Sequence, residues 1–122
     1  MPPISPIHAL MELLRRGKFD YADEKICQSQ IETFLRENRV SFIREYNVGN
    51  GIIDFFFPRT GIAMEVKASK TWSKVKVYRQ CERYCEHEQV KGLVLASGKA
   101  QGLPLEIKNK PVRVFQLGVN LL

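Results

Sequence analysis

The sequence predicts an α/β fold with a mixed central sheet. Two apolar runs rich in branched and aromatic residues, 51–57 and 62–67, flank a break at 58–61, which is typical of a β-hairpin. A helical pattern then separates the hairpin from an apolar run at 90–97, so this strand would join the sheet in parallel through a helical crossover. With 122 residues and 44% hydrophobic composition, the chain is long enough for one domain with its own core.

The first residues are expected to precede the domain. Residues 7–16 predict a short helix within an N-terminal arm, 1–19, that would contact DNA or a partner, and residues 20–122 are expected to form the domain. The N-terminus lacks the pattern of a secretory signal, and no run of eighteen apolar residues predicts a membrane span. We therefore expect an intracellular, cytoplasmic protein without a membrane partner, of cellular or viral origin.

Residues 23–39 predict the first long helix, which Asp20 or Asp23 can cap. Its apolar side would consist of Ile26, Cys27, Ile31, Phe34 and Leu35. Residues 40–48, which follow this helix, predict the first strand of the sheet.

Residues 71–88 predict the second long helix, which connects the hairpin to the strand at 90–97. Its core face would consist of Val75, Tyr78, Cys81 and Cys85. Residues 99–110 are expected to be a connector with room for a short helical turn, and residues 112–117 predict the last strand. The expected order is therefore α-α-β-β-β-α-β-β.

Three charged residues are expected to converge on one face of the hairpin. If the four-residue break closes the hairpin, Phe57 faces Ile62. Counting back along antiparallel strands then places Asp54 opposite Glu65, and the two-residue strand period adds Lys67 to the same face. Carboxylates are rare in such apolar strands unless they are paired or bind a metal ion. The alternative to a metal site is a buried ion pair between these acids and the lysine.

Opposed carboxylates at this spacing suit Mg²⁺, which prefers oxygen ligands and keeps several of its waters, and we expect that Mn²⁺ can substitute for it. One or two such ions can orient a water, lower its pKa and neutralise charge on a phosphodiester. Lys67 would hold or activate that water, or bind the phosphate.

Asp54, ten intervening residues and Glu65-Val66-Lys67 resemble the core motif of the PD-(D/E)XK nuclease superfamily. The proline that often precedes the aspartate is replaced here by Ile53. The resemblance implies a restriction-endonuclease-like three-layer α/β/α core with a mixed central sheet. It also implies that Asp54 and Glu65 bind Mg²⁺, with the carbonyl of Val66 as an added ligand, and that Lys67 takes part in catalysis.

Members of this superfamily commonly carry an acidic residue on the first core helix, and Glu24 is the candidate here. At about 100° per residue, Glu24 falls within about 60° of Ile31 and Leu35 around the helix axis. The string around it resembles the opening helix of the VRR-type nucleases, so Glu24 would complete the metal shell. Glu32 is the rival candidate, and a solvated acid without a role is the alternative for either.

Gln80 and Tyr84 resemble the Gln-x-x-x-Tyr element that follows the motif in RecB-like nucleases. The resemblance implies that Gln80 orients the substrate and that Tyr84 contacts nucleic acid, with ordinary packing as the alternative for Tyr84. The chain carries a net charge of +6, as expected for binding to a phosphate backbone. Trp72 lies in the same region and would either stack on a base or cover the start of the helix. The basic residues expected to bind nucleic acid are Lys70, Lys74, Lys76, Arg79 and Arg83.

The odd number of cysteines, without a secretory signal, predicts reduced thiols. Cys27, Cys81 and Cys85 are expected to be small core residues, since a zinc or iron–sulfur site would normally need four ligands. His8 and His87 are expected to lie at the surface.

Together these features predict a Mg²⁺-dependent DNA nuclease. The small size suits a structure-directed endonuclease, either similar to the archaeal-type Holliday-junction resolvases or of the VRR type. Because the resolvases act as dimers, we expect this chain to form a homodimer. The alternatives are a RecB-like exonuclease and a nucleic-acid-binding module of the same fold without catalytic activity.

Overall fold

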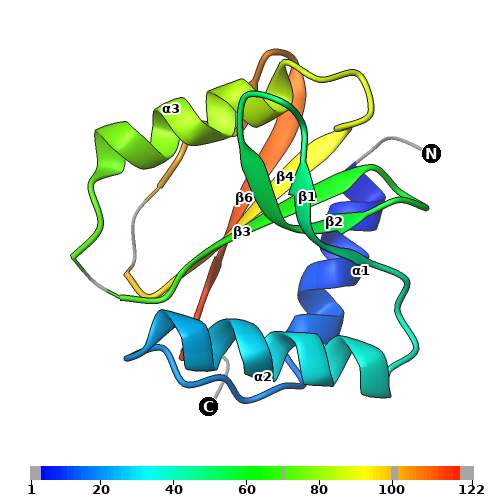
Figure 1. Cartoon of the computed structure of the whole chain (residues 1–122), viewed down its shortest axis with the longest axis vertical. Helices are drawn as coiled ribbons and strands as arrows, with labels where there is room; N and C mark the ends of the chain where they lie inside the picture. The colour runs from blue at the N-terminus through cyan, green and yellow to red at the C-terminus, as the bar shows by residue number, and fades with distance from the viewer. Residues whose placement is uncertain (1–3, 70, 100–101, 119–122) are drawn as a thin grey trace.

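The computed structural model describes residues 4–69, 71–99 and 102–118, which form three helices and six strands (Figure 1). The helices are α1 (Ile4–Leu14), α2 (Glu24–Glu37) and α3 (Lys74–Cys85). The strands are β1 (Ile43–Asn47), β2 (Ile52–Phe57), β3 (Ile62–Lys67), β4 (Gly92–Ser97), β5 (Glu106–Ile107) and β6 (Lys110–Gln116). No helix in these ranges has the length and apolar character needed to cross a bilayer.

The six strands form one mixed sheet in the order β1-β2-β3-β4-β6-β5. β2 is antiparallel to both β1 and β3, β4 is parallel to both β3 and β6, and β5 is antiparallel to β6. α3 joins β3 to its parallel neighbour β4, as a crossover requires. The α/β class with a mixed central sheet is therefore confirmed.

The hairpin of β2 and β3 has the register expected from its turn. Phe57 pairs with Ile62, and the last pair of this ladder joins Phe55 to Met64. Gly61 closes the loop by donating its N–H to the Phe57 carbonyl at 2.8 Å. Its φ of 77° lies in the left-handed region that glycine adopts without strain.

Helices cover both faces of the sheet, which gives three layers (Figure 1). Side chains of α1 and α2 share one buried cluster with one side of the sheet, and side chains of α3 share a second cluster with the other side. Members of the first cluster include Ile31, Leu35, Phe55, Met64 and Val66. Members of the second include Ile53, Phe56, Cys81, Tyr84 and Leu95.

Helix α1 is part of this core, which corrects the expectation of a separate N-terminal arm. Ile7 is fully buried and Leu14 is 1% exposed, both within the cluster that also contains α2. A Cβ atom at Gly92 would lie 2.8 Å from Cδ1 of Ile7, so the helix packs directly against β4. Burial of such side chains stabilises a fold by about 2 kcal/mol each, so α1 belongs to the domain.

Two apolar residues that were expected in the core are exposed. Ile26 of α2 is 47% exposed, and Val75 of α3 is 59% exposed. Ile26 lies about 140° around the helix from Ile31, and Val75 lies about 120° from Cys81, so neither shares the buried side of its helix. The buried residues of α3 are Val77, Cys81, Tyr84 and Cys85.

The connector between β4 and β6 holds a strand where a short helical turn was expected. β5 pairs with the start of β6 through a two-residue turn at Lys108 and Asn109. Both turn residues have positive φ angles, of 54° and 66°, as a type I′ hairpin turn requires. β6 consequently begins at Lys110, two residues before the predicted start.

Candidate functional site

Asp54 lies where β2 leaves the regular pattern of the sheet. Phe55 packs on the α1 and α2 side and Ile53 on the α3 side, although alternate residues of a regular strand share one face. In β1, Glu45 has a left-handed φ of 50°, and the β1–β2 ladder omits its pairing with Asp54. The strand therefore changes face at Asp54, which has no partner in the β1–β2 ladder or in the β2–β3 ladder.

The carboxylate of Asp54 is held at β3. Oδ2 of Asp54 accepts a hydrogen bond from the N–H of Val66 at 2.8 Å. The N–H and C=O groups of one strand residue point toward the same neighbouring strand, so the Val66 carbonyl also faces the Asp54 side of β3. The carbonyl that was expected to be an added metal ligand is thus directed toward the aspartate.

Glu65 and Lys67 form a buried ion pair that satisfies only one of the two carboxylate oxygens. Oε2 of Glu65 lies 3.2 Å from Nζ of Lys67, with side-chain exposures of 3% and 21% respectively. Oε1 of Glu65 is buried and makes no hydrogen bond of normal geometry among the described residues, although the Tyr84 hydroxyl and the Asp54 carboxyl lie close enough to the Glu65 carboxyl to affect its pKa. A buried acceptor without a partner costs about 1–3 kcal/mol, and more when it is charged. A cation or a hydrogen-bond donor bound to Oε1 would therefore stabilise the protein.

The three charged residues influence one another strongly. Burial and the charge of Asp54 raise the pKa of Glu65 to about 8, against the opposing effect of Lys67. Burial also raises the pKa of Asp54, although the Val66 N–H and Lys67 counteract this. Burial alone would lower the pKa of Lys67, but the nearby Glu65 outweighs it and the pKa is raised. Asp54, Glu65 and Lys67 therefore lie close together, although the β2–β3 ladder ends at Phe55 and Met64 and does not include the predicted Asp54–Glu65 pair.

The metal-free protein should lose stability as the pH rises from about 4.5, the ordinary pKa of a glutamate, to about 8, the pKa of Glu65 in the folded protein. The folded state binds the Glu65 proton more tightly than the unfolded state, so the stabilisation is complete below the unfolded pKa and is lost above the folded one. Glu65→Gln removes this dependence. In EDTA, the melting temperature of the variant minus that of the wild type should be larger at high pH, by on the order of 5–10 °C. A difference that does not change with pH would contradict the raised pKa.

Glu24, rather than Glu32, lies near these acids. Glu24 is the first residue of α2, directly after Asp23, which caps the helix by accepting the Ile26 N–H at 3.0 Å. The charge of Glu24 raises the pKa of Asp54. Glu32 instead pairs with two arginines, and these hydrogen bonds lower its pKa. Nowhere in the described ranges do three His, Cys, Asp or Glu side chains lie close enough together to hold a metal ion by themselves.

Tyr84 is a core residue that orients Gln80, not a surface for nucleic acid. Its side chain is fully buried, so direct contact with DNA is excluded in this structure. The Tyr84 hydroxyl donates to the Ile52 carbonyl at 2.6 Å and accepts from Nε2 of Gln80 at 3.0 Å. A Cβ at Gly51 would lie 2.9 Å from the Tyr84 ring, so this position suits glycine. Gln80 is half-buried between the core face and the basic residues of α3.

The predicted basic residues that the structure describes lie on α3 and are exposed. Lys76, Arg79 and Arg83 fall within about 60° of one another around the helix axis, on the side opposite to its core face. We call these three residues the α3 basic stripe. Lys74 is exposed at the start of the helix, and Lys70 lies outside the described residues.

Trp72 covers the start of α3 instead of projecting into solvent. Nζ of Lys99 lies 4.1 Å from the centroid of its ring and donates to the Trp72 carbonyl at 3.0 Å. The ring also packs against the buried cluster beneath α3. His87 is half-buried and bonds Oδ1 of Asn50 at 2.7 Å, at the β1–β2 turn.

The three cysteines are free and buried, which confirms their prediction as small core residues. Burial raises the pKa of Cys27 to about 12 and that of Cys85 to about 11. Burial and the charge of Glu65 also raise the pKa of Cys81. Thiols in this state are poor nucleophiles and poor metal ligands.

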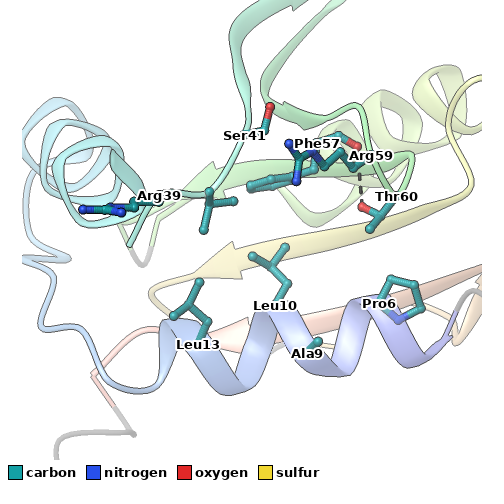
Figure 2. A pocket seen from close by; sticks show the side chains of 10 residues that line it. Pro6, Ala9, Leu10, Leu13, Arg39, Ser41, Phe57, Arg59 and Thr60 are labelled. Carbon is teal, nitrogen blue, oxygen red and sulfur yellow. Dashed lines mark hydrogen bonds between the residues drawn. The ribbon is translucent and has the colours of Figure 1, made fainter. Parts of the chain in front are cut away.

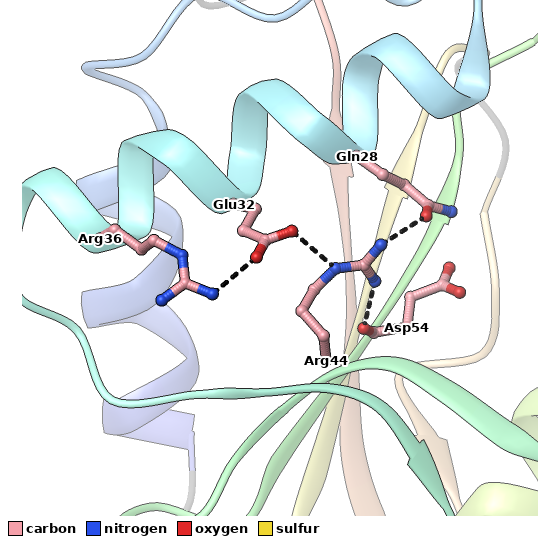
Figure 3. Close-up of polar contacts among 5 residues, drawn as sticks. All are labelled: Gln28, Glu32, Arg36, Arg44 and Asp54. Atoms are coloured by element: carbon pink, nitrogen blue, oxygen red, sulfur yellow. Dashed lines mark hydrogen bonds and ion pairs between the residues drawn. The ribbon is translucent and has the colours of Figure 1, made fainter.

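Arg44 was not among the predicted site residues, yet its guanidinium lies beside Asp54 (Figure 3). It donates to three acceptors: the Asp54 carbonyl at 2.7 Å, Oε1 of Gln28 at 3.1 Å and Oε1 of Glu32 at 3.2 Å. A signal was available, because the β1–β2 turn at Val48 and Gly51 sets a register in which Arg44 pairs with Phe55. The turn itself was not predicted, so the pairing of Arg44 with Phe55 was not predicted either.

A separate pocket of about 280 Å³ lies between α1 and the tip of the β2–β3 hairpin (Figure 2). Its lining is mainly apolar, with the guanidinium groups of Arg39 and Arg59 beside it, and includes Leu10, Leu13, Val40 and Phe57. None of the predicted site residues lines this pocket. It is therefore distinct from the group of Glu24, Asp54, Glu65 and Lys67, which we call the charged cluster.

Comparison with known proteins identifies the family but not an activity. No curated protein and no solved structure matches the chain. A family model described as Domain of unknown function (DUF8371) matches residues 8–109. The matched range includes most of α1 and the whole of the charged cluster. The chain therefore belongs to the DUF8371 family.

Proposed function

We propose that this protein is a Mg²⁺-dependent nuclease that hydrolyses phosphodiester bonds in DNA. The observation that carries the proposal is the buried Oε1 of Glu65, which lacks a partner in a cluster with Asp54. A bound cation would be the partner that Oε1 lacks, and it would offset the repulsion between the two carboxylates when both are ionised. An ion pair with Lys67 alone leaves Oε1 unsatisfied, which is why a metal site is the better account.

The order of elements supports a restriction-endonuclease-like core of the PD-(D/E)XK type. α2 precedes three antiparallel strands, and α3 then crosses to the parallel strand β4. Asp54 belongs to β2, and Glu65 and Lys67 belong to β3. The motif residues therefore lie on adjacent strands, as the resemblance implies.

The proposed Mg²⁺ ligands are the carboxylates of Asp54 and Glu65 and the carbonyl of Val66. Such a donor set fits Mg²⁺, which is usually held by one or two carboxylates and keeps several waters. Glu24 lies near Asp54 without completing a three-carboxylate group, so it would contact the ion through one of these waters. When bound, Mg²⁺ lowers the pKa of a coordinated water and neutralises charge on the phosphate.

Lys67 and Gln80 would position the reactants. The raised pKa of Lys67 keeps its ammonium protonated at neutral pH, so it would bind the scissile phosphate or orient the water, and would not act as a base. Gln80 is held by the Tyr84 hydroxyl and presents a neutral amide that can hydrogen-bond phosphate or water. The α3 basic stripe and Lys74 would bind the DNA backbone.

Purified protein should cut DNA in Mg²⁺ or Mn²⁺ but not in EDTA, and Asp54→Asn should reduce this rate by about 10³-fold, equal to about 4 kcal/mol of activation free energy. The asparagine keeps the shape of the side chain and removes the charge. Cleavage would be measured on supercoiled, linear, single-stranded and four-way-junction DNA. Wild-type protein that binds these substrates but cuts none of them in either metal would overturn the proposal in favour of a binding module.

The substrate profile also separates the forms of the proposed activity. Paired cuts in four-way-junction DNA by a homodimer would support a resolvase-like endonuclease, and the molar mass in solution would be measured alongside. Degradation from the ends of linear DNA, without cutting of closed circles, would support a RecB-like exonuclease.

A further inference from the structure

Arg44 connects the two elements that carry acids of the charged cluster. It extends from β1 toward α2, and its side chain is 23% exposed. The guanidinium carbon lies 4.5 Å from the centroid of the Phe55 ring, so one face of the group is covered. The hydrogen bonds in the plane of the group reach β2 and α2 at the same time (Figure 3).

Toward β2, Arg44 replaces a missing backbone partner. The β1–β2 ladder pairs residues on both sides of Asp54 but omits Asp54 itself. The Asp54 carbonyl accepts its hydrogen bond from Nη1 of Arg44 at 2.7 Å. Buried carbonyl groups are almost always hydrogen-bonded, so Arg44 stabilises the irregular backbone at Asp54. In this backbone conformation the Asp54 side chain reaches the Val66 N–H of β3.

Toward α2, Arg44 is held by two acceptors one turn apart. Nη2 donates to Oε1 of Gln28 at 3.1 Å, and Nε donates to Oε1 of Glu32 at 3.2 Å. Gln28 lies one turn after Glu24, so these bonds fix the helix that carries Glu24 relative to β2. The planar fork of donors on a guanidinium can serve acceptors in several directions at once, which a lysine ammonium on a flexible stem does less well.

We propose that Arg44 is a positioning residue, which holds the Asp54 peptide and the start of α2 in the arrangement that a metal ion requires. The proposal rests on the function proposed above, since it names what preorganises that site. Arg44 would touch neither the metal nor the substrate. Its effect would pass through the direction of the Asp54 carboxylate, which is reported by the hydrogen bond from Val66.

Arg36 offers a matched control. It is also an arginine that pairs with Glu32, at 2.7 Å, and it lies over an aromatic ring, that of Phe42, at 5.2 Å. In Figure 3 it lies at the far end of the same network and has no bond to Asp54. Arg36→Met therefore removes a comparable surface interaction and leaves the Asp54 peptide supported.

The test compares Arg44→Met, Arg44→Lys and Arg36→Met with the wild type. Arg44→Met should speed hydrogen exchange at the Val66 amide by about tenfold or more relative to other β3 amides, and should shrink the Mg²⁺- or Mn²⁺-induced rise in melting temperature. It should also lower kcat by about 10–100-fold with little change in KM, as for other residues that orient metal ligands. Arg44→Lys should behave like Arg44→Met, and Arg36→Met like the wild type.

These readouts distinguish failure of this proposal from failure of the proposed function. Unchanged exchange at Val66 and an unchanged metal-induced shift in Arg44→Met would overturn the positioning role, even if the wild-type protein cuts DNA. Full recovery of both by Arg44→Lys would also overturn it, because charge alone would then suffice. A wild-type protein without cleavage would refute the nuclease, while exchange at Val66 would still decide what Arg44 holds in place.

Discussion

Replacement of Glu65 with glutamine should reduce Mg²⁺-dependent cleavage by about 10³-fold or more, while DNA binding stays within about twofold of the wild type. Glutamine has nearly the same shape as glutamate but cannot supply the anionic oxygen that the cation needs. The variant should also fold, because glutamine cannot acquire the buried charge that Glu65 carries next to Asp54 above its pKa of about 8. Cleavage would be followed in single-turnover assays, and binding in EDTA by fluorescence anisotropy.

Glu106→Gln provides the matched control, since Glu106 is an exposed glutamate in β5, away from the charged cluster. It should cut DNA at the wild-type rate. Cleavage by Glu65→Gln at the rate of this control would show that Oε1 does not serve a metal ion. The pair Glu65 and Lys67 would then be structural, as in the ion-pair alternative.

Neutralising the α3 basic stripe with Lys76→Gln, Arg79→Gln and Arg83→Gln should weaken DNA binding by about 10²–10³-fold at low salt. Each lysine or arginine that pairs with a phosphate adds about 0.9 to the slope of log K against log salt concentration, so the triple variant should lose nearly 3 from this slope. Binding would be measured from about 50 to 200 mM salt in EDTA, with melting temperatures to confirm folding.

The control for this variant removes the same formal charge elsewhere. Arg16, Lys18 and Arg59 are exposed and lie outside α3. Their replacement by glutamine should change the slope by less than one unit if α3 is the main contact surface. Equal losses in both triple variants would indicate that net charge, and not the stripe, attracts the DNA.

The charged cluster was predictable because its geometry depends on a local turn. Phe57 and Ile62 flank a four-residue loop closed by Gly61, so counting along the two strands was enough to bring Asp54 and Glu65 together. The change of face at Asp54 was not predictable in this way. It depends on the left-handed conformation of Glu45 and on Arg44, which belong to a strand whose connection to β2 was not predicted.

The helix faces show a second limit of sequence patterns. Ile26 and Val75 are apolar, but their angular positions lie far from the buried residues of α2 and α3, and hydrophobicity alone does not reveal which side a helix buries. Tyr84 was predicted to contact nucleic acid, with ordinary packing as the alternative. The sequence could not decide between the two, because its role in the core depends on a carbonyl group 32 residues earlier, that of Ile52. The β5 turn was missed because Lys108 and Asn109 are an uncommon pair for two left-handed residues.

The proton on Glu65 also affects how DNA and cation would assemble at the site. Below its pKa of about 8, Glu65 is protonated, which removes one negative charge from the group that also contains Asp54, Glu24 and Lys67. The loss of this charge weakens the repulsion of an approaching phosphate, so DNA could dock before Mg²⁺ arrives. Entry of the ion would then expel one proton, which makes uptake of Mg²⁺ tighter in mildly alkaline buffer.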